Sequence, residues 1–319
     1  MKNNELSDNK WFAVVNPNAG NRAIKREWKM IHREMTSKGL NFDYALTEHP
    51  FHTLEIVDDA LKKGYRKIIA IGGDGTLNEA ANAMLDFKDF HPDTHLLALI
   101  PAGTGNDWGR MFNVPKKGVQ AVKTVIKGKE FTQDVGVITY FDNGQQKKRY
   151  FINIAGMGFD ALVAQKTNKQ RAEGKSNAYS YLINLLTSFL QYKPGMIQVE
   201  IDGVKYNFNA FSISVGICRY NGGGIMQLPN AIPDDGLLDI TIIKKFGLGS
   251  VLSLLRNLYN GQFVKHPKVS TFTAKRVTIL SKKPGFMMEA DGESLGQAPF
   301  EITIIPRSLR LIIGSWNSQ

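Results

Sequence analysis

The stretch Gly72-Gly73-Asp74-Gly75-Thr76-Leu77-Asn78-Glu79 decides the fold expected for the first half of this chain. It lies between the apolar run Lys67–Ile71, which predicts a buried strand, and the pattern Leu77–Leu85, which predicts a helix. Three glycines in four positions let the backbone approach a bulky anion closely, with its amides directed at it. The N-terminus of the following helix adds a positive partial charge. A tight turn that merely requires glycine is the alternative, and Asp74 at the end of a buried strand argues against it.

Strand-like and helical patterns alternate on both sides of this stretch through the first 130 residues. Such alternation, with continuously apolar strands, predicts a parallel sheet covered by helices on both faces. The predicted strands are Trp11–Val15, Phe42–Leu46, Lys67–Ile71 and Leu96–Ile100, and the predicted helices cover residues 22–38, 51–63, 77–85 and 119–126. Ligands bind such sheets at the carboxyl ends of the strands, which directs attention to the loops after them.

Two further polar loops follow predicted strands. Asn16-Pro17-Asn18-Ala19-Gly20 follows the first strand, and Pro101-Ala102-Gly103-Thr104-Gly105-Asn106-Asp107 follows the fourth. Thr76 can cap a helix or bond a phosphate, whereas Asp74 would repel a phosphate unless a cation such as Mg²⁺ lay between them. Three polar, glycine-bearing loops at one sheet edge are stronger evidence for an anion site than any one of them.

From about Phe131 the pattern changes to short, turn-linked strands, and Asp142-Asn143-Gly144 and Asp202-Gly203 are hairpin signals. The strand-like segments are 132–141, 149–155, 196–202, 205–217, 237–243, 275–280, 286–290 and 300–305, with helices near 158–170, 177–191 and 248–259. We therefore expect an α/β domain over residues 1–130 and a β-rich antiparallel sandwich over residues 131–306. Residues 307–319, which include the apolar run Leu309–Gly314, leave open a return to the first domain.

Composition limits the alternatives. The chain has 319 residues and a net charge of +11, which favours polyanionic partners without choosing among them. No aromatic-rich basic motif favours nucleic acid. Cys218 is the single cysteine and excludes an internal disulfide and a cysteine-based zinc site, and the six histidines suggest surface or capping roles. No secretory signal or membrane span is evident, so a cytoplasmic location is expected.

Acidic turns mark the second half. Two carboxylates around a glycine in Ala290-Asp291-Gly292-Glu293 could divide proton transfer and orientation between them, although an isolated Asp-Gly is more simply a hairpin turn. The turn from Pro233 to Asp239 could bind a cation or merely close a hairpin. The P-loop motif, the protein-kinase catalytic loop and the dinucleotide-binding glycine fingerprint after the first strand are all missing from the sequence.

Taken in order, these motifs closely resemble the diacylglycerol kinase catalytic family, nearest its bacterial soluble lipid kinases, which are related to sphingosine and ceramide kinases. The resemblance also covers Gly156-x-Gly158-Phe159-Asp160 and Asp235-Gly236-x-Leu238-Asp239, so that it spans nearly the whole chain. Gly-Gly-Asp-Gly-Thr alone is shared with NAD kinases.

The resemblance implies an ATP site in the cleft between the two domains. It implies nucleotide contacts from the polar loops, at Asn16, Pro17, Asn18, Ala19, Gly20, Thr47, Gly72, Gly73, Asp74, Gly75, Thr76, Leu77, Asn78, Gly103, Thr104 and Asn106. It further implies a structural Mg²⁺ at Asp235, aided by main-chain carbonyls near Ile232 and Leu237, and a proton acceptor at Glu293 with Asp291 beside it. Thr47 and Ile232 match by position only.

The expected activity is in-line transfer of the γ-phosphate of ATP to a lipid hydroxyl, with Mg²⁺ neutralising charge. The acceptor lipid is open among diacylglycerol, a sphingoid base and phosphatidylglycerol. The enzyme would meet its substrate at an anionic membrane surface, as a peripheral protein that does not bind nucleic acid, and a homo-oligomer is left open. The helix expected over Tyr179–Leu190 is interpreted as a core helix, with lining of an acyl-chain site as the alternative. An NAD kinase and a non-catalytic nucleotide- or lipid-sensing protein are the other hypotheses.

Overall fold

The computed structural model describes residues 9–102, 105–159, 161–162, 192, 195–245, 257–280 and 287–316, without the side chains of residues 21–23 and 297. The chain divides into two compact units. Unit 1 comprises Met1–Asp134 with Arg307–Gln319, and unit 2 comprises Val135–Pro306. The segments expected as helices over residues 177–191, including Tyr179–Leu190, and over most of 158–170 and 248–259 lie outside the described residues.

Unit 1 is built on a parallel sheet in the order β4-β3-β1-β2. Its strands are β1 (Trp11–Val15), β2 (Phe42–Leu46), β3 (Lys67–Gly72) and β4 (Leu96–Pro101). β3 and β4 are buried almost throughout, which explains their unbroken apolar sequences, whereas β2 lies at the sheet edge and is only partly buried. The final strand β17 (Phe300–Ile313) lies next to β4, where Leu311 pairs in parallel with Leu97.

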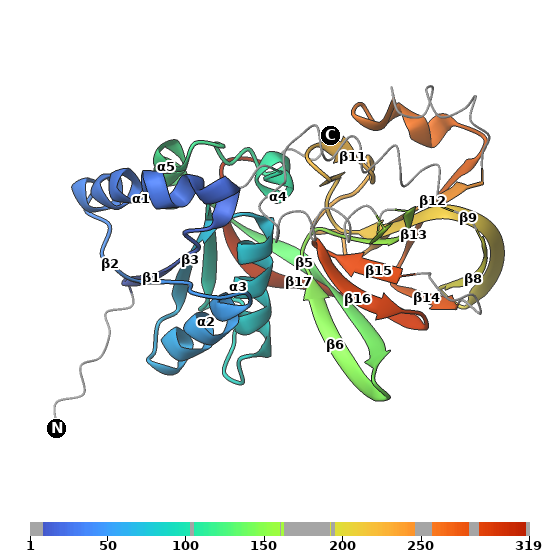
Figure 1. Cartoon of the computed structure of the whole chain (residues 1–319), viewed down its shortest axis with the longest axis horizontal. Helices are drawn as coiled ribbons and strands as arrows, with labels where there is room; N and C mark the ends of the chain where they lie inside the picture. The colour runs from blue at the N-terminus through green and yellow to red at the C-terminus, as the bar shows by residue number, and fades with distance from the viewer. Residues whose placement is uncertain are drawn as a thin grey trace. The chain divides into compact units, whose positions relative to one another are not determined.

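Helices cover both faces of this sheet. They are α1 (Ala19–Ser37), α2 (His52–Lys62), α3 (Asp74–Asp86), α4 (Asp107–Met111) and α5 (Gly118–Lys127). α2 packs against α3 and α1 packs against α5, so that the two pairs lie on opposite faces (Figure 1). α3 begins three residues earlier than Leu77, where the sequence pattern placed its start, because the glycine-rich turn itself forms its first helical turn. Helix α4 was not expected.

Unit 2 is β-rich and antiparallel. Its strands are β5 (Lys129–Asp142), β6 (Gln145–Phe151), β7 (Ile154–Gly158), β8 (Gly195–Ile201), β9 (Val204–Gly216), β12 (Leu238–Lys244), β13 (Val269–Ala274), β14 (Arg276–Leu280), β15 (Met287–Ala290) and β16 (Glu293–Gln297), with the small hairpin β10 (Tyr220–Asn221) and β11 (Ile225–Met226) and the short helix η1 (Gln262–Lys265). The central order is β16-β15-β7-β9-β8-β14, with β12 on β9 and β13 on β12. The expected fold class, an α/β domain followed by a β-rich sandwich, is confirmed.

Turn chemistry explains two hairpins of unit 2. Asn143 and Gly144 join β5 to β6, and Asp202 and Gly203 join β8 to β9, all four with positive φ. Both hairpins were predicted. The sequence pattern, by contrast, ended one strand at residue 305 and placed a separate apolar run at Leu309–Gly314, whereas β17 runs continuously through Pro306. Residues 305–307 are exposed there and Arg307 has a φ of 45°, so the strand tolerates the missing N–H at an irregular, solvent-facing step.

The structure shows the environment of the single cysteine and the character of the helices. Cys218 is a buried thiol whose Sγ lies 3.5 Å from the carbonyl oxygen of Ile152, as a small core residue would be. None of the helices in the described part of the chain has the length and apolar character needed to cross a membrane.

Candidate functional site

Four loops lie side by side at the carboxyl edge of the unit 1 sheet. Backbone hydrogen bonds carry the pairing one step past the strand ends, from Thr47 N to Val15 O (2.8 Å), Asn16 N to Ile71 O (2.9 Å) and Ala102 N to Gly72 O (2.8 Å). The loops therefore follow the strand order, with Thr47 beside Asn16, Asn16 beside the glycine-rich turn, and that turn beside Ala102. Gly103 and Thr104, two of the expected nucleotide contacts, lie outside the described residues.

The glycine-rich turn is joined to the first loop by a side-chain hydrogen bond. Asn16 Nδ2 donates to Thr76 Oγ1 at 3.2 Å, and Asn16 Oδ1 accepts the N–H of Asn18 at 3.0 Å. The second bond forms an Asx turn that leads into α1, whose first residues are Ala19 and Gly20. Asn16 and Pro17 are half-buried and Asn18 is exposed, so this loop presents polar groups to solvent.

The glycines of the turn have different roles. A Cβ at Gly72 would lie 2.7 Å from the Cβ of Thr76, so Gly72 is required for close packing of strand and helix. A Cβ at Gly75 would meet no atom within 4 Å, so the space beside its backbone is open. Gly73 is the extended N-cap of α3, which places the backbone N–H groups of the first helical turn at this edge.

Leu77 and Asn78 are placed differently from the rest of the turn. Both side chains are fully buried, and Asn78 Oδ1 accepts a hydrogen bond from Asn82 Nδ2 at 3.1 Å. The structure thus gives these two expected nucleotide contacts a packing role, and a direct contact with nucleotide would involve their backbone. Thr47 and Thr76 are also buried, with 7% and 4% exposure, at the base of the loops.

Asp74 links the glycine-rich turn to the loop after β4. Its Oδ2 accepts the N–H of Asp107 at 3.2 Å and its Oδ1 accepts the N–H of Trp108 at 3.3 Å, which caps α4. A Cβ at Gly105 would lie 3.2 Å from Asp74 Oδ2 and 3.3 Å from Asp107 Oδ2, so the two carboxylates flank this glycine. Asn106 is buried and left-handed at the N-cap of α4. The capping role of Asp74 was missed by sequence reasoning, because α4 itself was not expected.

In unit 2, Asp291 and Glu293 belong to the hairpin that joins β15 to β16. Asp291 has a φ of 49°, and its carboxylate accepts the N–H groups of Ile152 (2.8 Å), Asn153 (3.1 Å) and Ile154 (3.0 Å). Glu293 is half-buried, and no hydrogen bond or ion pair reaches its carboxylate from the residues that the structure describes. The two acids therefore differ, because Asp291 holds the hairpin through three hydrogen bonds and Glu293 makes no such bond to the described residues.

Glu289 supports the same hairpin and was missed by sequence reasoning. It is 2% exposed, and it accepts the N–H of Gly292 at 2.7 Å and a hydrogen bond from Asn221 Nδ2 at 3.2 Å. The available signal was an acidic residue inside the otherwise apolar strand Met287–Ala290. A buried carboxylate must be hydrogen-bonded, and here its partners tie the hairpin to the glycine-rich loop 221–224.

Carboxylates are crowded in the turn before β12. Asp235 Oδ1 accepts the N–H of Leu237 at 3.0 Å, and Ile232 and Leu237 are half-buried in the same turn. Burial, reinforced by the charge of Asp235, raises the pKa of Asp239 to about 7. Burial, reinforced by the charge of Asp234, also raises the pKa of Asp235. The carboxylate of Asp235 and the main-chain carbonyls of this turn are oxygen groups of the kind that Mg²⁺ prefers.

The two acidic turns of unit 2 lie at the same edge of its sheet. Asp291 N donates to Ile154 O at 3.0 Å, Ile154 pairs with Gly216, and Gly216 pairs with Asp239. This row crosses three strand spacings, or roughly 14 Å. The structure thus brings the two turns to one edge without bringing them into contact.

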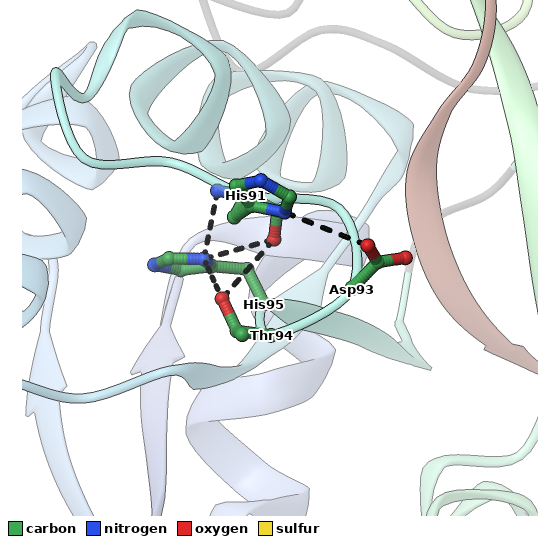
Figure 2. Close-up of polar contacts among 4 residues, drawn as sticks. All are labelled: His91, Asp93, Thr94 and His95. Atoms are coloured by element: carbon green, nitrogen blue, oxygen red, sulfur yellow. Dashed lines mark hydrogen bonds and ion pairs between the residues drawn. The ribbon is translucent and has the colours of Figure 1, made fainter.

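Two histidines, His95 and His52, form hydrogen bonds within the loops that precede β4 and α2. His95 is buried before β4, with Nδ1 3.1 Å from the carbonyl oxygen of His91 (Figure 2). Its Nε2 lies 3.2 Å from Arg66 Nη1. Because Arg66 is only a donor, Nε2 accepts from it, while the backbone N–H of His91 also lies 3.1 Å from Nδ1. Burial, with the neighbouring charge of Arg66, lowers the pKa of His95.

A second histidine pair lies near the start of α2, where His49, His52 and Glu55 bring their ligand atoms within 4.8 Å of one another. His52 Nδ1 accepts the N–H of Glu48 at 3.0 Å. This bond leaves the proton of the neutral ring on Nε2, so the arrangement favours a role in holding the loop before α2 over metal binding.

Comparison with known proteins covers both units. The family model described as the diacylglycerol kinase catalytic domain matches residues 10–138, and that described as the YegS C-terminal NAD kinase beta sandwich-like domain matches residues 153–313. A diacylglycerol kinase from Mycobacterium tuberculosis is 30% identical over 303 residues, with 94% of each chain covered. One from Staphylococcus carnosus is 29% identical over 287 residues, with 90% of this chain and 89% of its own covered.

The fold of the chain also matches that of a solved structure. The crystal structure of a diacylglycerol kinase from Bacillus anthracis matches with a TM-score of 0.70 at 21% identity, with 96% of this chain and 97% of the other covered. The matched models span the glycine-rich turn of unit 1 and the acidic hairpin of unit 2. The chain belongs to the diacylglycerol kinase catalytic family of lipid kinases.

Proposed function

We propose that this protein is an ATP-dependent lipid kinase that transfers the γ-phosphate to the hydroxyl of diacylglycerol or a related lipid alcohol. The observation that carries the proposal is the row of polar loops at one sheet edge of unit 1, with open space beside the backbone of Gly75. The names of the relatives support the same acceptor class. Phosphoryl transfer depends mainly on positioning and charge stabilisation, which such loops supply.

In this mechanism unit 1 holds ATP. The backbone N–H groups at the start of α3 bind phosphate oxygens, with the helix dipole in their favour. Thr76, held by Asn16, keeps the glycine-rich turn and the first loop in register. The open space beside Gly75 lets a phosphate approach the backbone without meeting a side chain.

Unit 2 supplies the proton acceptor. As the lipid oxygen bonds to the γ-phosphorus, its proton passes to the carboxylate of Glu293, and the bond from the γ-phosphorus to the bridging oxygen breaks to release ADP. Asp291 holds the hairpin that carries Glu293 by accepting the N–H of Asn153. Glu289 supports the same hairpin by accepting the N–H of Gly292.

Two sets of residues fit Mg²⁺. The carboxylates of Asp74 and Asp107 approach each other around Gly105, so a cation would relieve their repulsion beside the phosphates. Asp235, with main-chain carbonyls of Ile232 and Leu237, would hold a structural ion in the acidic turn, where burial, reinforced by the charge of Asp235, raises the pKa of Asp239. When bound, Mg²⁺ would supply charge neutralisation.

The test is a panel of acceptors. Purified protein is incubated with γ-labelled ATP, Mg²⁺ and mixed micelles of diacylglycerol, a sphingoid base or phosphatidylglycerol, with NAD as a separate acceptor, and products are identified by mass. We expect labelled phosphatidic acid from diacylglycerol and none with Glu293→Gln. NADP formation would favour an NAD kinase, and tight ATP binding without turnover on any acceptor would favour a sensor at the membrane surface.

A further inference from the structure

The positive charge of the chain is concentrated in one segment of unit 2. Residues 240–288 contain nine lysines and arginines and no aspartate or glutamate. This segment runs from β12 to the start of β15. Lys275 and Arg276 lie beside acids of the fold, because Asp202 accepts their backbone N–H groups and Arg276 pairs with Glu301. The other basic residues of the segment that the structure describes include Lys244, Lys245 and Lys268.

These three lysines line one groove. The groove has a volume of about 520 Å³, and its remaining lining is Asn207, Phe208 and Asn209. Backbone hydrogen bonds draw the lysines together, from Lys244 N to Lys268 O and from Lys245 N to Asn209 O, both at 2.8 Å. Within the described part of the chain, none of the three forms an ion pair, and Lys244 Nζ lies 5.6 Å from the ring centroid of Phe208. The groove therefore presents uncompensated cations and amide donors.

An exposed apolar side chain lies beside the groove. Met196 on β8 pairs with Asn209 on β9, so the two side chains share a face of the sheet, and Met196 is 61% exposed. A small soluble anion would use the lysines and asparagines alone. A membrane interface would use the cations for its phosphates and would also accept the methionine among its acyl chains.

We propose that the groove formed by Lys244, Lys245 and Lys268 is the surface by which this protein docks onto anionic phospholipid headgroups. The proposal rests on the proposed function, since a lipid kinase must reach a substrate that lies in a bilayer. The headgroup phosphates bind the lysine ammonium groups and the amides of Asn207 and Asn209, and Met196 enters the interface. Binding therefore depends on anionic lipid and falls as salt rises.

The experiment is vesicle co-sedimentation. Wild-type protein is titrated with vesicles of phosphatidylcholine alone and with vesicles that contain phosphatidylglycerol. The test variant carries Lys244→Gln, Lys245→Gln and Lys268→Gln together, and the matched control carries Lys63→Gln, Lys116→Gln and Lys123→Gln, three exposed lysines of unit 1. At about fivefold per lysine, we expect the test variant to bind phosphatidylglycerol vesicles about 100-fold more weakly, and the control to bind nearly as wild type does.

Several outcomes would overturn the proposal. Equal losses in both variants would mean that net charge alone drives binding, and no binding of phosphatidylglycerol vesicles by wild type would exclude docking altogether. Displacement by millimolar inorganic phosphate would indicate a small-anion site, and tighter binding of a DNA duplex than of vesicles would indicate a nucleic-acid surface. Thermal unfolding of both variants checks that each is folded.

A second readout separates this inference from the proposed function. On a short-chain diacylglycerol dissolved as monomers, the test variant should retain its kcat. On diacylglycerol carried in phosphatidylglycerol vesicles, its KM for diacylglycerol should rise. Wild type that turns over no lipid at all would refute the proposed function, while vesicle binding, which needs no turnover, would still decide the docking surface. Equal loss of activity on monomers and vesicles would overturn the docking role.

Discussion

Asp291 Oδ1 accepts the backbone N–H of Asn153 at 3.1 Å, although the two residues are 138 positions apart in the chain. The neighbouring N–H groups of Ile152 and Ile154 bond to the same carboxylate. The hairpin that carries Glu293 is thereby fastened to the strand start at β7 through one side chain. The placement of the proposed proton acceptor thus depends on a residue that need not take part in proton transfer itself.

Substitutions of these two acids should have opposite signatures. Glu293→Gln should lower kcat by about 100-fold or more and leave the free energy of unfolding unchanged, because its carboxylate holds no part of the described fold. Asp291→Asn should lower the free energy of unfolding by about 1–3 kcal/mol, because an amide N–H would face backbone N–H groups. Urea denaturation and initial rates on each variant measure both quantities. An active Glu293→Gln enzyme would contradict the mechanism.

Gly72 and Gly75 offer a second matched pair. Gly75→Ala adds a methyl group to open space, so we expect unchanged or slightly higher stability and a raised KM for ATP. Gly72→Ala drives a methyl group into Thr76, so we expect the free energy of unfolding to fall by about 1–3 kcal/mol. Thermal unfolding with and without ATP distinguishes the two. A Gly75→Ala variant with an unaltered KM would show that phosphate does not approach this backbone.

Stability should depend on pH through His95. Burial lowers its pKa below the ordinary value of 6.5, so the folded state favours the neutral ring. Its contribution is complete above pH 6.5, and it is lost as pH falls through the lower pKa of the folded state, where the unfolded chain binds the proton more readily. We expect His95→Gln to flatten the fall in unfolding free energy below pH 6.5, as measured by urea denaturation at several pH values. The exposed His49→Gln variant serves as control, and equal slopes for both variants would contradict the assignment.

Mg²⁺ should stabilise the acidic turn of unit 2. Addition of millimolar Mg²⁺ to chelator-treated protein should raise the Tm, because an ion that binds only the folded state shifts the unfolding equilibrium. Asp235→Asn should reduce this response, and Asp142→Asn, which alters a hairpin acid paired with Lys147, should retain it in full. Differential scanning calorimetry measures both. A Tm rise of equal size in the Asp235→Asn variant would place the ion elsewhere.

Local patterns predicted much of the fold. The apolar run before Gly72 identified β3, and Asn143-Gly144 and Asp202-Gly203 identified their hairpins, because strand burial and positive φ depend on neighbouring residues. The half-exposed strand β13 and the short strand β16 were missed, since neither has a continuous apolar pattern. The continuity of β17 through Pro306 was also missed, because a sequence pattern does not show that this step of the strand faces solvent.

The functional site likewise has features that the sequence predicted and features that only the structure showed. By itself, the sequence determined which segments bear chemistry, because glycine-rich turns and paired acids show their character within a few positions. Only the tertiary structure decided what each acid does. Asp74 caps α4 and Asp291 holds the start of β7, since the N–H groups that they accept come from segments far along the chain. A carboxylate binds whichever donors packing brings to it, and spacing along the chain does not encode that packing.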